Sequence, residues 1–526
     1  PRIDAFAESW RAARTQACLD GEVEHTLTPR ALAGARACLD EQRGFLRRFV
    51  QVLAEPDGTV VAEAALAVWA LPVADACLDP AELERSAELD DPRAQARAQA
   101  VRERLADAMA LRQTGRFAAA LVVDQEALGE ALALEIPQLL AAVRIDEGDS
   151  LIELGRYHEA EATLEAAYRT AALAGDDARM QRAANLLVFT VGNRLARPQD
   201  AARWAWLAAI ARERREIPDA HPDVAAGINN EAAVEWAQGK WHEARAHFEQ
   251  ALAIREAALG PNHPEVAVVL GNLGGVELEL GNHRAARDHL ERALVIETTV
   301  FGPDHPMLAK SLGNLGNVLM VAGDHAQALA RHQRALALLE TSLPPDHPDT
   351  ARTLGNVGNV YAQLGRHEEA LAAHQRTLAI LERTVSPEHP DFVSTLNNLA
   401  TAQQALGRYD EALEVQARAL AILERREGAE QADVAMALNN LGSIHIERGS
   451  PDDALPVLGR ALAIWERELG PDHPYVAAAL LNLGVVHLAR GEPSEALAMD
   501  QRALTLWETS LAPQHPYPTS ARLQVG

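Results

Sequence analysis

The hydrophobic positions of residues 347–386 predict two consecutive helices. In the first segment the apolar side chains stand three or four residues apart, which places them on one helix face: Leu354, Val357, Val360 and Leu364. A second segment carries an apolar face of the same kind: Ala370, Leu371, Leu378 and Leu381. Each helix therefore has one face to bury and a polar face to expose.

Glycine and proline residues mark the ends of both helices. Pro348 stands at a first helical position, where its missing N–H costs no hydrogen bond. Gly365 ends the first helix because glycine tolerates a positive φ. Pro387 closes the second helix because a proline inside a helix loses a hydrogen bond and clashes with the preceding turn. The small residues Gly358 and Ala370 fall where the two helices of this predicted hairpin must approach closely.

The hairpin pattern recurs with a step of 42 residues. Asparagine returns at Asn230, Asn272, Asn314, Asn356, Asn398, Asn440 and Asn482. Glycine returns at Gly239, Gly281, Gly323, Gly365, Gly407, Gly449 and Gly491. His-Pro pairs begin at His221, His263, His305, His347, His389, His473 and His515, with Gln431 and Ala432 replacing one pair. One hairpin cannot bury its apolar stripe but a stack can, so the repeat predicts an all-α solenoid.

A weaker form of the pattern extends upstream of the regular repeats. Its members are Gly115, Phe117 and Ala120, then Gly155, Tyr157 and Ala160, then a hairpin near Ala202 with Arg197 in the glycine position. We therefore expect about ten antiparallel hairpins. The predicted organisation is an N-terminal helical segment at 1–97, degenerate hairpins at 98–218, seven regular repeats at 219–512 and the truncated start of another at 513–526.

These motifs resemble the tetratricopeptide repeat. The resemblance rests on a helix-ending glycine followed by an aromatic residue and an alanine, as in Gly407, Tyr409 and Ala412. The 42-residue step, the Asp-His-Pro signature and Asn397-Asn398-Leu399 are similar to the kinesin-light-chain type. The resemblance implies a right-handed superhelix that binds protein or peptide, with ladders of asparagine facing the bound peptide.

The first ninety residues do not share the period. They contain Ala-Cys-Leu-Asp three times, with Cys18, Cys38 and Cys77, and predict helices near 4–19, 29–54 and 59–78. With Trp10, this stretch resembles the segment that precedes the repeats in bacterial tetratricopeptide-containing serine/threonine kinases. That resemblance implies a kinase domain and a membrane helix upstream, and the chain itself contains no Gly-rich nucleotide loop, His-Arg-Asp or Asp-Phe-Gly motif. Pro1 and Gly526 fall in mid-pattern, so we expect a piece of a longer protein.

Two interpretations of the cysteines remain open. They are buried small hydrophobic residues, or Cys18 and Cys77 form a disulfide in an oxidising compartment. The second interpretation requires this segment to lie outside the cytoplasm, as the kinase resemblance implies. Without an upstream membrane helix, we expect a cytoplasmic location.

Composition narrows the class of partner. The chain has 49 basic and 75 acidic residues, a formal net charge of −26, which argues against a general nucleic-acid binder and against adsorption to an anionic membrane. Aromatic residues make up only 4 % of the chain, as suits close-packed helices rather than a β-sandwich. We therefore expect protein or extended-peptide partners, and the oligomeric state stays open.

The first helices carry the candidate binding residues. Each has a polar stripe opposite the core, which includes the seven repeated asparagines together with Asn317 and Asn359. Asparagine is unfavourable inside a helix, so its repetition needs a reason. Its amide offers a donor and an acceptor to a peptide backbone. Alternatively, each asparagine bonds the neighbouring repeat and sets the superhelix. Lys310 and Arg352 share one register and predict a site for acidic residues, unless both are solvated surface charges.

The chain shows no arrangement that predicts an enzyme, a cofactor site or a metal site. The Gly-Asn-Leu-Gly-Gly run at 271–275 lies in mid-helix and not in a phosphate-binding turn. The His-Pro histidines come one per repeat, too far apart to converge on one zinc ion, and are expected to pack at loop-to-helix junctions. Three functions follow: a peptide-binding scaffold, the regulatory region of a kinase absent from this chain, or a self-associating structural array.

Overall fold

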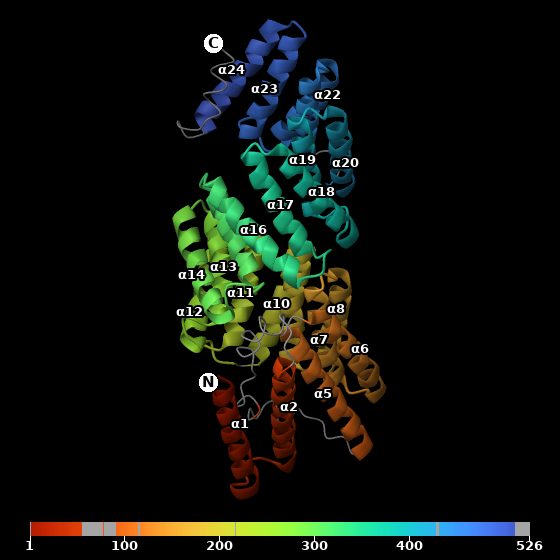
Figure 1. Cartoon of the computed structure of the whole chain (residues 1–526), viewed down its shortest axis with the longest axis vertical. Coiled ribbons are helices and arrows are strands. Elements are labelled where there is room, and N and C mark those ends of the chain that lie inside the picture. Colours follow the sequence, from red (N-terminus) through yellow and green to blue (C-terminus); the bar gives the residue numbers. More distant parts are fainter. Residues whose placement is uncertain are drawn as a thin grey trace. The chain divides into compact units, whose positions relative to one another are not determined.

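The computed structural model describes residues 2–54, 77, 91–113, 116–215, 217–427 and 431–510. Within these ranges every regular element is a helix, as the predicted all-α fold requires (Figure 1). The truncated repeat predicted at 513–526 lies outside the described residues, and so does the helix predicted at 59–78 apart from Cys77.

The chain divides into two compact units, residues 1–345 and 346–526, called here the N-terminal unit and the C-terminal unit. The N-terminal unit begins with α1 (Arg2–Cys18), the π-helix η1 (Leu19–Val23) and α2 (Pro29–Ala54). Six hairpins follow: α5 (Pro92–Gln113) with α6 (Phe117–Leu134), α7 (Pro137–Glu153) with α8 (Tyr157–Leu173), α9 (Asp177–Leu187) and the π-helix η3 (Val188–Arg194) with α10 (Pro198–Arg214), α11 (Pro222–Ala237) with α12 (Trp241–Leu259), α13 (Pro264–Glu279) with α14 (His283–Phe301), and α15 (Leu308–Val321) with α16 (His325–Ser342).

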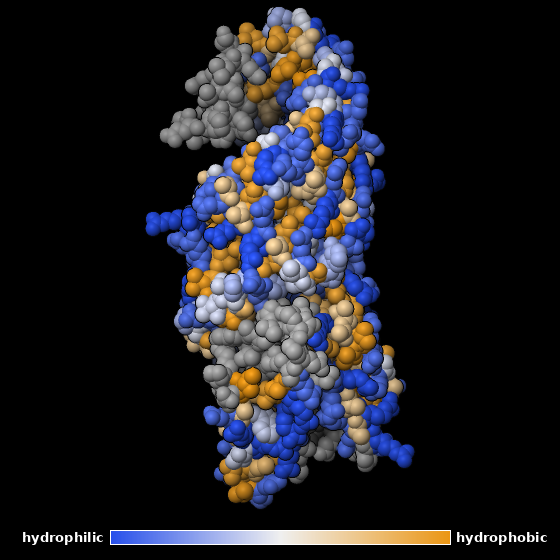
Figure 2. Space-filling model, viewed as in Figure 1, coloured by the Kyte–Doolittle hydropathy of each residue, from blue (hydrophilic) through white to orange (hydrophobic). Residues whose placement is uncertain are grey.

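The C-terminal unit contains four hairpins of the same kind. They are α17 (Pro348–Gln363) with α18 (His367–Thr384), α19 (Pro390–Ala405) with α20 (Tyr409–Glu427), α21 (Ala432–Arg448) with α22 (Pro451–Glu468), and α23 (Pro474–Ala489) with α24 (Pro493–Ser510). In both units the two helices of each hairpin pack against each other and against the next hairpin. Figure 2 shows hydrophilic and hydrophobic residues interspersed along the hairpins on the viewed face.

The His-Pro pairs form the N-terminal caps of first helices. Where the helix begins with proline, the histidine Nδ1 accepts the backbone N–H two residues later at 3.1–3.2 Å: His221, His263, His347, His389 and His473. Such caps satisfy one of the N–H groups that a helix start leaves without a partner. Gln431, which replaces histidine before α21, makes no side-chain cap bond. The histidines therefore lie at loop-to-helix junctions, and His515 lies outside the described residues.

The repeated glycines adopt the backbone conformation that the sequence predicts. All seven have φ between +71° and +85°, which an L side chain rarely adopts. The third hairpin departs from this rule, because Arg197 in the glycine position has φ −118° and the positive φ falls on Ala196 at +53°. The π-helix η3 precedes that turn, so this hairpin is irregular at the point where its sequence is degenerate.

Small residues let the two helices of a hairpin approach closely, as predicted for Gly358. A Cβ on Gly358 would lie 2.6 Å from Cε1 of His374, so the ring fills the space that a larger residue would need. The same register holds leucine elsewhere, where Gly274 faces Leu290 and Gly442 faces Leu458. This contact forms the centre of each hairpin core.

Successive second helices are joined by long ion pairs. An arginine bonds the glutamate 36 residues before it at 2.5–2.9 Å in four cases: Arg292–Glu256, Arg418–Glu382, Arg460–Glu424 and Arg502–Glu466. Successive first helices contact each other directly, as α13 does with α15 and α21 with α23, whereas contacts between successive second helices are sparser. First helices therefore line the inner side of each stack.

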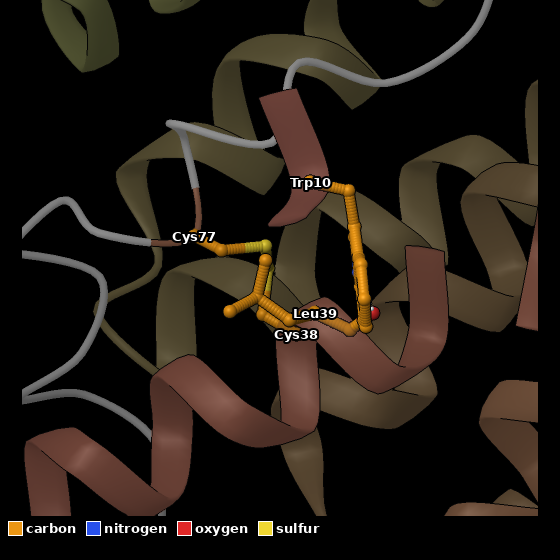
Figure 3. The surroundings of a disulfide bond; sticks show 4 residues. All are labelled: Trp10, Cys38, Leu39 and Cys77. Carbon is orange, nitrogen blue, oxygen red and sulfur yellow. Dashed lines mark hydrogen bonds between the residues drawn. A yellow bond between two sulfur atoms is a disulfide. The ribbon is translucent and has the colours of Figure 1, made fainter. Parts of the chain in front are cut away.

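The N-terminal segment contains a disulfide that differs from the expected one. Cys38 is bonded to Cys77, with a Cα–Cα distance of 5.6 Å, and Cys18 is not bridged (Figure 3). The expectation of a Cys18–Cys77 pair was therefore wrong. Cys38 lies in the middle of α2, beside Leu39, whose carbonyl accepts a hydrogen bond from Trp10 Nε1 at 2.6 Å, and this contact ties α1 to α2. Cysteine spacing along the chain could not reveal which residue of α1 or α2 faces Cys77.

Candidate functional site

The repeated asparagines lie on the first helices and none of their side chains is fully exposed. Asn272 is buried, and the other six are half-buried: Asn230, Asn314, Asn356, Asn398, Asn440 and Asn482. These seven residues are called the amide stripe. The core positions predicted opposite it in α15 are buried: Leu312, Leu315 and Val318. The stripe therefore occupies the polar side of helices whose other side is packed.

Several stripe amides bond the preceding repeat. Asn272 Nδ2 donates to Asn229 Oδ1 at 3.0 Å, and Asn482 Nδ2 donates to Asn439 Oδ1 at 2.9 Å. In both pairs the acceptor is the residue just before the previous stripe asparagine. A short side chain bridges the two helices here, as expected where first helices approach more closely than second helices do.

The acceptor changes where glycine holds that preceding position. Asn314 Nδ2 donates to the backbone carbonyl of Gly271 at 3.4 Å. Asn398 Nδ2 instead donates to Asn359 Oδ1 at 2.9 Å, one helical turn further along α17. Bonding to the neighbouring repeat, one of the two interpretations of the asparagines, is therefore present at four stripe positions.

The remaining stripe residues have a different environment. Within the ranges that the structure describes, the side chains of Asn230, Asn356 and Asn440 make no hydrogen bond to protein. The same holds for Asn317 in α15. Each of these amides is half-buried and keeps both N–H groups and its oxygen available. The stripe thus contains bonded amides and amides open to a ligand.

The two candidate cations lie in different units. Lys310 is exposed, and its Nζ donates to Asn272 Oδ1 at 3.1 Å. Near it, Glu297 is buried and accepts a hydrogen bond from Ser311 Oγ at 2.9 Å, and burial raises the pKa of Glu297 to about 7. Arg352 in α17 forms an ion pair with Asp349 one turn earlier. Each cation therefore has an internal partner, and their joint action on one ligand stays a prediction.

A buried charged cluster in the first hairpins escaped the sequence reasoning. Arg112 Nη1 lies 2.9 Å from Asp124 Oδ2, and its Nη2 lies 3.2 Å from Asp146 Oδ1. Ser150 Oγ also donates to Asp124 at 2.6 Å. Burial raises the pKa of Asp124 to about 6 despite the guanidinium beside it. These residues lie in degenerate hairpins, where no repeat comparison marks them.

The described residues offer no metal centre and no membrane span. Among them, no three or more His, Cys, Asp or Glu side chains are grouped so that they could hold a metal ion. No described helix combines the length and apolar character needed to cross a membrane.

Structures of known proteins similar to the chain include other repeat solenoids. A Rap protein complexed with competence and sporulation factor is 17 % identical, with 71 % of this chain and 99 % of that chain covered and a TM-score of 0.49. TPR-like repeats assigned to a kinesin light chain of Podosopora anserina are 23 % identical, with 40 % and 99 % covered and a TM-score of 0.36. BtubC (BKLC) from P. vanneervenii is 22 % identical, with 45 % and 94 % covered and a TM-score of 0.36.

Comparison by sequence points to one family. No curated protein matches the chain. A tetratricopeptide repeat family model matches overlapping segments at 223–296, 275–341, 307–383, 349–425, 391–464 and 433–509, which together cover more than half of the sequence. A second tetratricopeptide repeat model matches 141–166 in the degenerate region. The chain belongs to the tetratricopeptide repeat family.

Proposed function

We propose that this chain is a protein-binding scaffold whose first helices hold an extended peptide segment of a partner. Solenoids of stacked hairpins present long inner surfaces that suit such ligands. The observation that carries the proposal is the amide stripe, in which bonded and open asparagines share one register on the inner side of each stack.

The two kinds of amide have different roles in this proposal. The bonded residues hold neighbouring first helices at a fixed spacing, which prepares the surface before the peptide arrives. The open residues, such as Asn356 and Asn440 in the C-terminal unit, donate to and accept from the peptide backbone. A backbone contact of this kind recognises extended chain with little dependence on its side chains.

The cations would add selectivity to the amide contacts. Lys310 and Arg352 are exposed on the same register as the amide stripe, each in its own unit. An acidic residue of the peptide would compete with Asn272 for Lys310 and with Asp349 for Arg352. Replacement of either cation by glutamate should weaken binding of an acidic peptide, and more strongly at low salt.

The test begins with peptides selected from a phage-displayed library on the full chain. The Kd of the tightest fluorescein-labelled peptide is then measured by fluorescence anisotropy for two double variants. Asn356→Ala with Asn440→Ala removes open amides, and we expect binding about tenfold weaker, because each hydrogen bond contributes about 1 kcal/mol. Thermal unfolding of this variant should stay close to that of the native chain.

A matched pair of variants separates binding from stability. Asn398→Ala with Asn482→Ala removes two bonds between repeats and should lower the unfolding temperature. Gln375→Ala, an exposed amide on the second helix α18, should change neither property. The proposal fails if the open-amide variant binds every selected peptide as tightly as the native chain does.

A further inference from the structure

A cavity of about 510 Å³ lies in the N-terminal unit where the third hairpin meets the fourth. The end of α10, the loop after it, α11 and α12 line this cavity. Val224 and Ile228 of α11 supply apolar walls, and Gln250 of α12 lies at an exposed edge. The cavity therefore lies between the second helices α10 and α12, away from the amide stripe.

The repeat pattern shows what fills the corresponding place elsewhere. Gln250 occupies a register that holds arginine in each of the six following repeats: Arg292, Arg334, Arg376, Arg418, Arg460 and Arg502. Arg292 Nη2 lies 2.5 Å from Glu256 Oε1 of the preceding second helix and 3.1 Å from the carbonyl oxygen of Pro261 in the loop after it. Arg334 similarly bonds the Pro303 carbonyl at 3.1 Å and the Asp304 carboxylate.

The residues that would receive such an arginine are also changed at the cavity. Arg214 stands 42 residues before Glu256, and it pairs instead with Asp177 at 3.3 Å. Asp219 stands 42 residues before Pro261, and it lines the cavity. The cavity is therefore the place where a repeating guanidinium and its usual glutamate are both missing, and where the loop offers an extra carboxylate.

The lining of the cavity carries more negative than positive charge. Glu213, Asp219 and Glu231 contribute three carboxylates, and Arg212 contributes one guanidinium. Arg212 already pairs with Glu231 at 3.3 Å, whereas Glu213 and Asp219 are exposed at the cavity. His247, which also lines the cavity, is paired with a glutamate outside it. This charge favours a cationic ligand with an apolar stem.

We propose that this cavity binds the side chain of an arginine from a partner protein. Its guanidinium takes the place of the arginine that the other repeats supply from within and meets the carboxylates of Glu213 and Asp219. Its aliphatic stem packs against Val224 and Ile228. A planar guanidinium fits better than an ammonium, because Arg292 and Arg334 each bond a carbonyl and a carboxylate together in the occupied counterparts.

Saturation-transfer NMR on the full chain with N-acetyl-arginine amide tests this proposal. The uncharged isostere N-acetyl-citrulline amide is the control ligand, and we expect it to bind about fivefold more weakly. Gln250→Arg restores the residue of the other repeats and fills the cavity, so the signal from the arginine ligand should be lost. Gln375→Arg, an exposed change on another second helix, should leave that signal intact.

A second variant keeps the test informative if Gln250→Arg disturbs the fold. Glu213→Gln with Asp219→Asn leaves the shape of the cavity unchanged and should weaken the arginine ligand about fivefold, with helical circular dichroism unaltered. Equal signals from the arginine and citrulline ligands would overturn the proposal, and so would undiminished binding by a folded Gln250→Arg protein. Neither outcome bears on the amide stripe, which lies on the first helices.

Discussion

Two buried histidines make the stability of their hairpins depend on pH. His332 and His374 are each 1 % exposed, and each packs against a glycine of the first helix. Their Nδ1 atoms are buried without a hydrogen-bond partner. Burial lowers the pKa of both rings from 6.5 to about 4, because the charged form would lose its hydration.

The sign of the effect follows from the protons bound in each state. Between pH 6.5 and about 4 the unfolded chain binds protons at these histidines and the folded chain does not, so the free energy of unfolding falls as the pH is lowered. At pH 5 each histidine costs about 2 kcal/mol through this difference. Glu297 and Asp124, whose pKa values burial raises, act in the opposite direction over part of the same range.

Replacement by leucine should remove this cost, and the chain supplies the template. Leu290 and Leu458 occupy the same register and pack against glycine in the same way. We therefore expect His332→Leu and His374→Leu each to stabilise their hairpins by about 1 kcal/mol at pH 7, where a buried unpaired nitrogen is removed, and by about 2 kcal/mol more at pH 5. Glu297 and Asp124 are unchanged in both variants, so their effects cancel in the comparison.

Hydrogen exchange followed by mass spectrometry measures this locally in the full chain. Exchange in α15 and α16 reports on His332, and exchange in α17 and α18 reports on His374. His242→Leu is the control, because His242 is exposed and should give no gain. A gain of equal size at pH 5 and pH 7, or no gain, would refute the desolvation reasoning.

Three other measurements test separate parts of the structure. Arg112→Met should destabilise α5–α8 by about 3–5 kcal/mol, since it leaves carboxylates buried without their cation, and unchanged exchange there would contradict the cluster. A digest without reducing agent should release the Cys38 and Cys77 peptides joined, and reduction should cost about 4 kcal/mol for a separation of 39 residues; separate peptides would disprove the bridge. A double-mutant cycle on Asn398 and Asn359 should give a coupling of about 1 kcal/mol, whereas additive effects would exclude their bond.

The hairpins and their caps could be predicted because the 42-residue comparison isolates local requirements. A positive φ at Gly365 and a helix start at Pro348 depend on residues close in sequence, and the structure has both. The buried faces followed from helical periodicity for the same reason. These features repeat, so each hairpin supports the interpretation of the others.

Features that depend on distance between elements could not be predicted. The partner of a stripe asparagine changes with its neighbour's sequence, as Asn314 bonds a Gly271 carbonyl and Asn398 bonds an amide. The partner of Cys77 depended on how α1 and α2 pack, which spacing does not reveal. The ion pairs 36 residues apart were accessible, since arginine and glutamate recur at that spacing in the sequence.

The most direct test of the proposed function is the footprint of a selected peptide on the full chain. Hydrogen exchange is measured with and without saturating peptide, and protection is compared between first and second helices. We predict protection in first helices, such as α17, α19 and α21, and little change in α18 and α20. Protection confined to second helices would contradict peptide binding along the amide stripe.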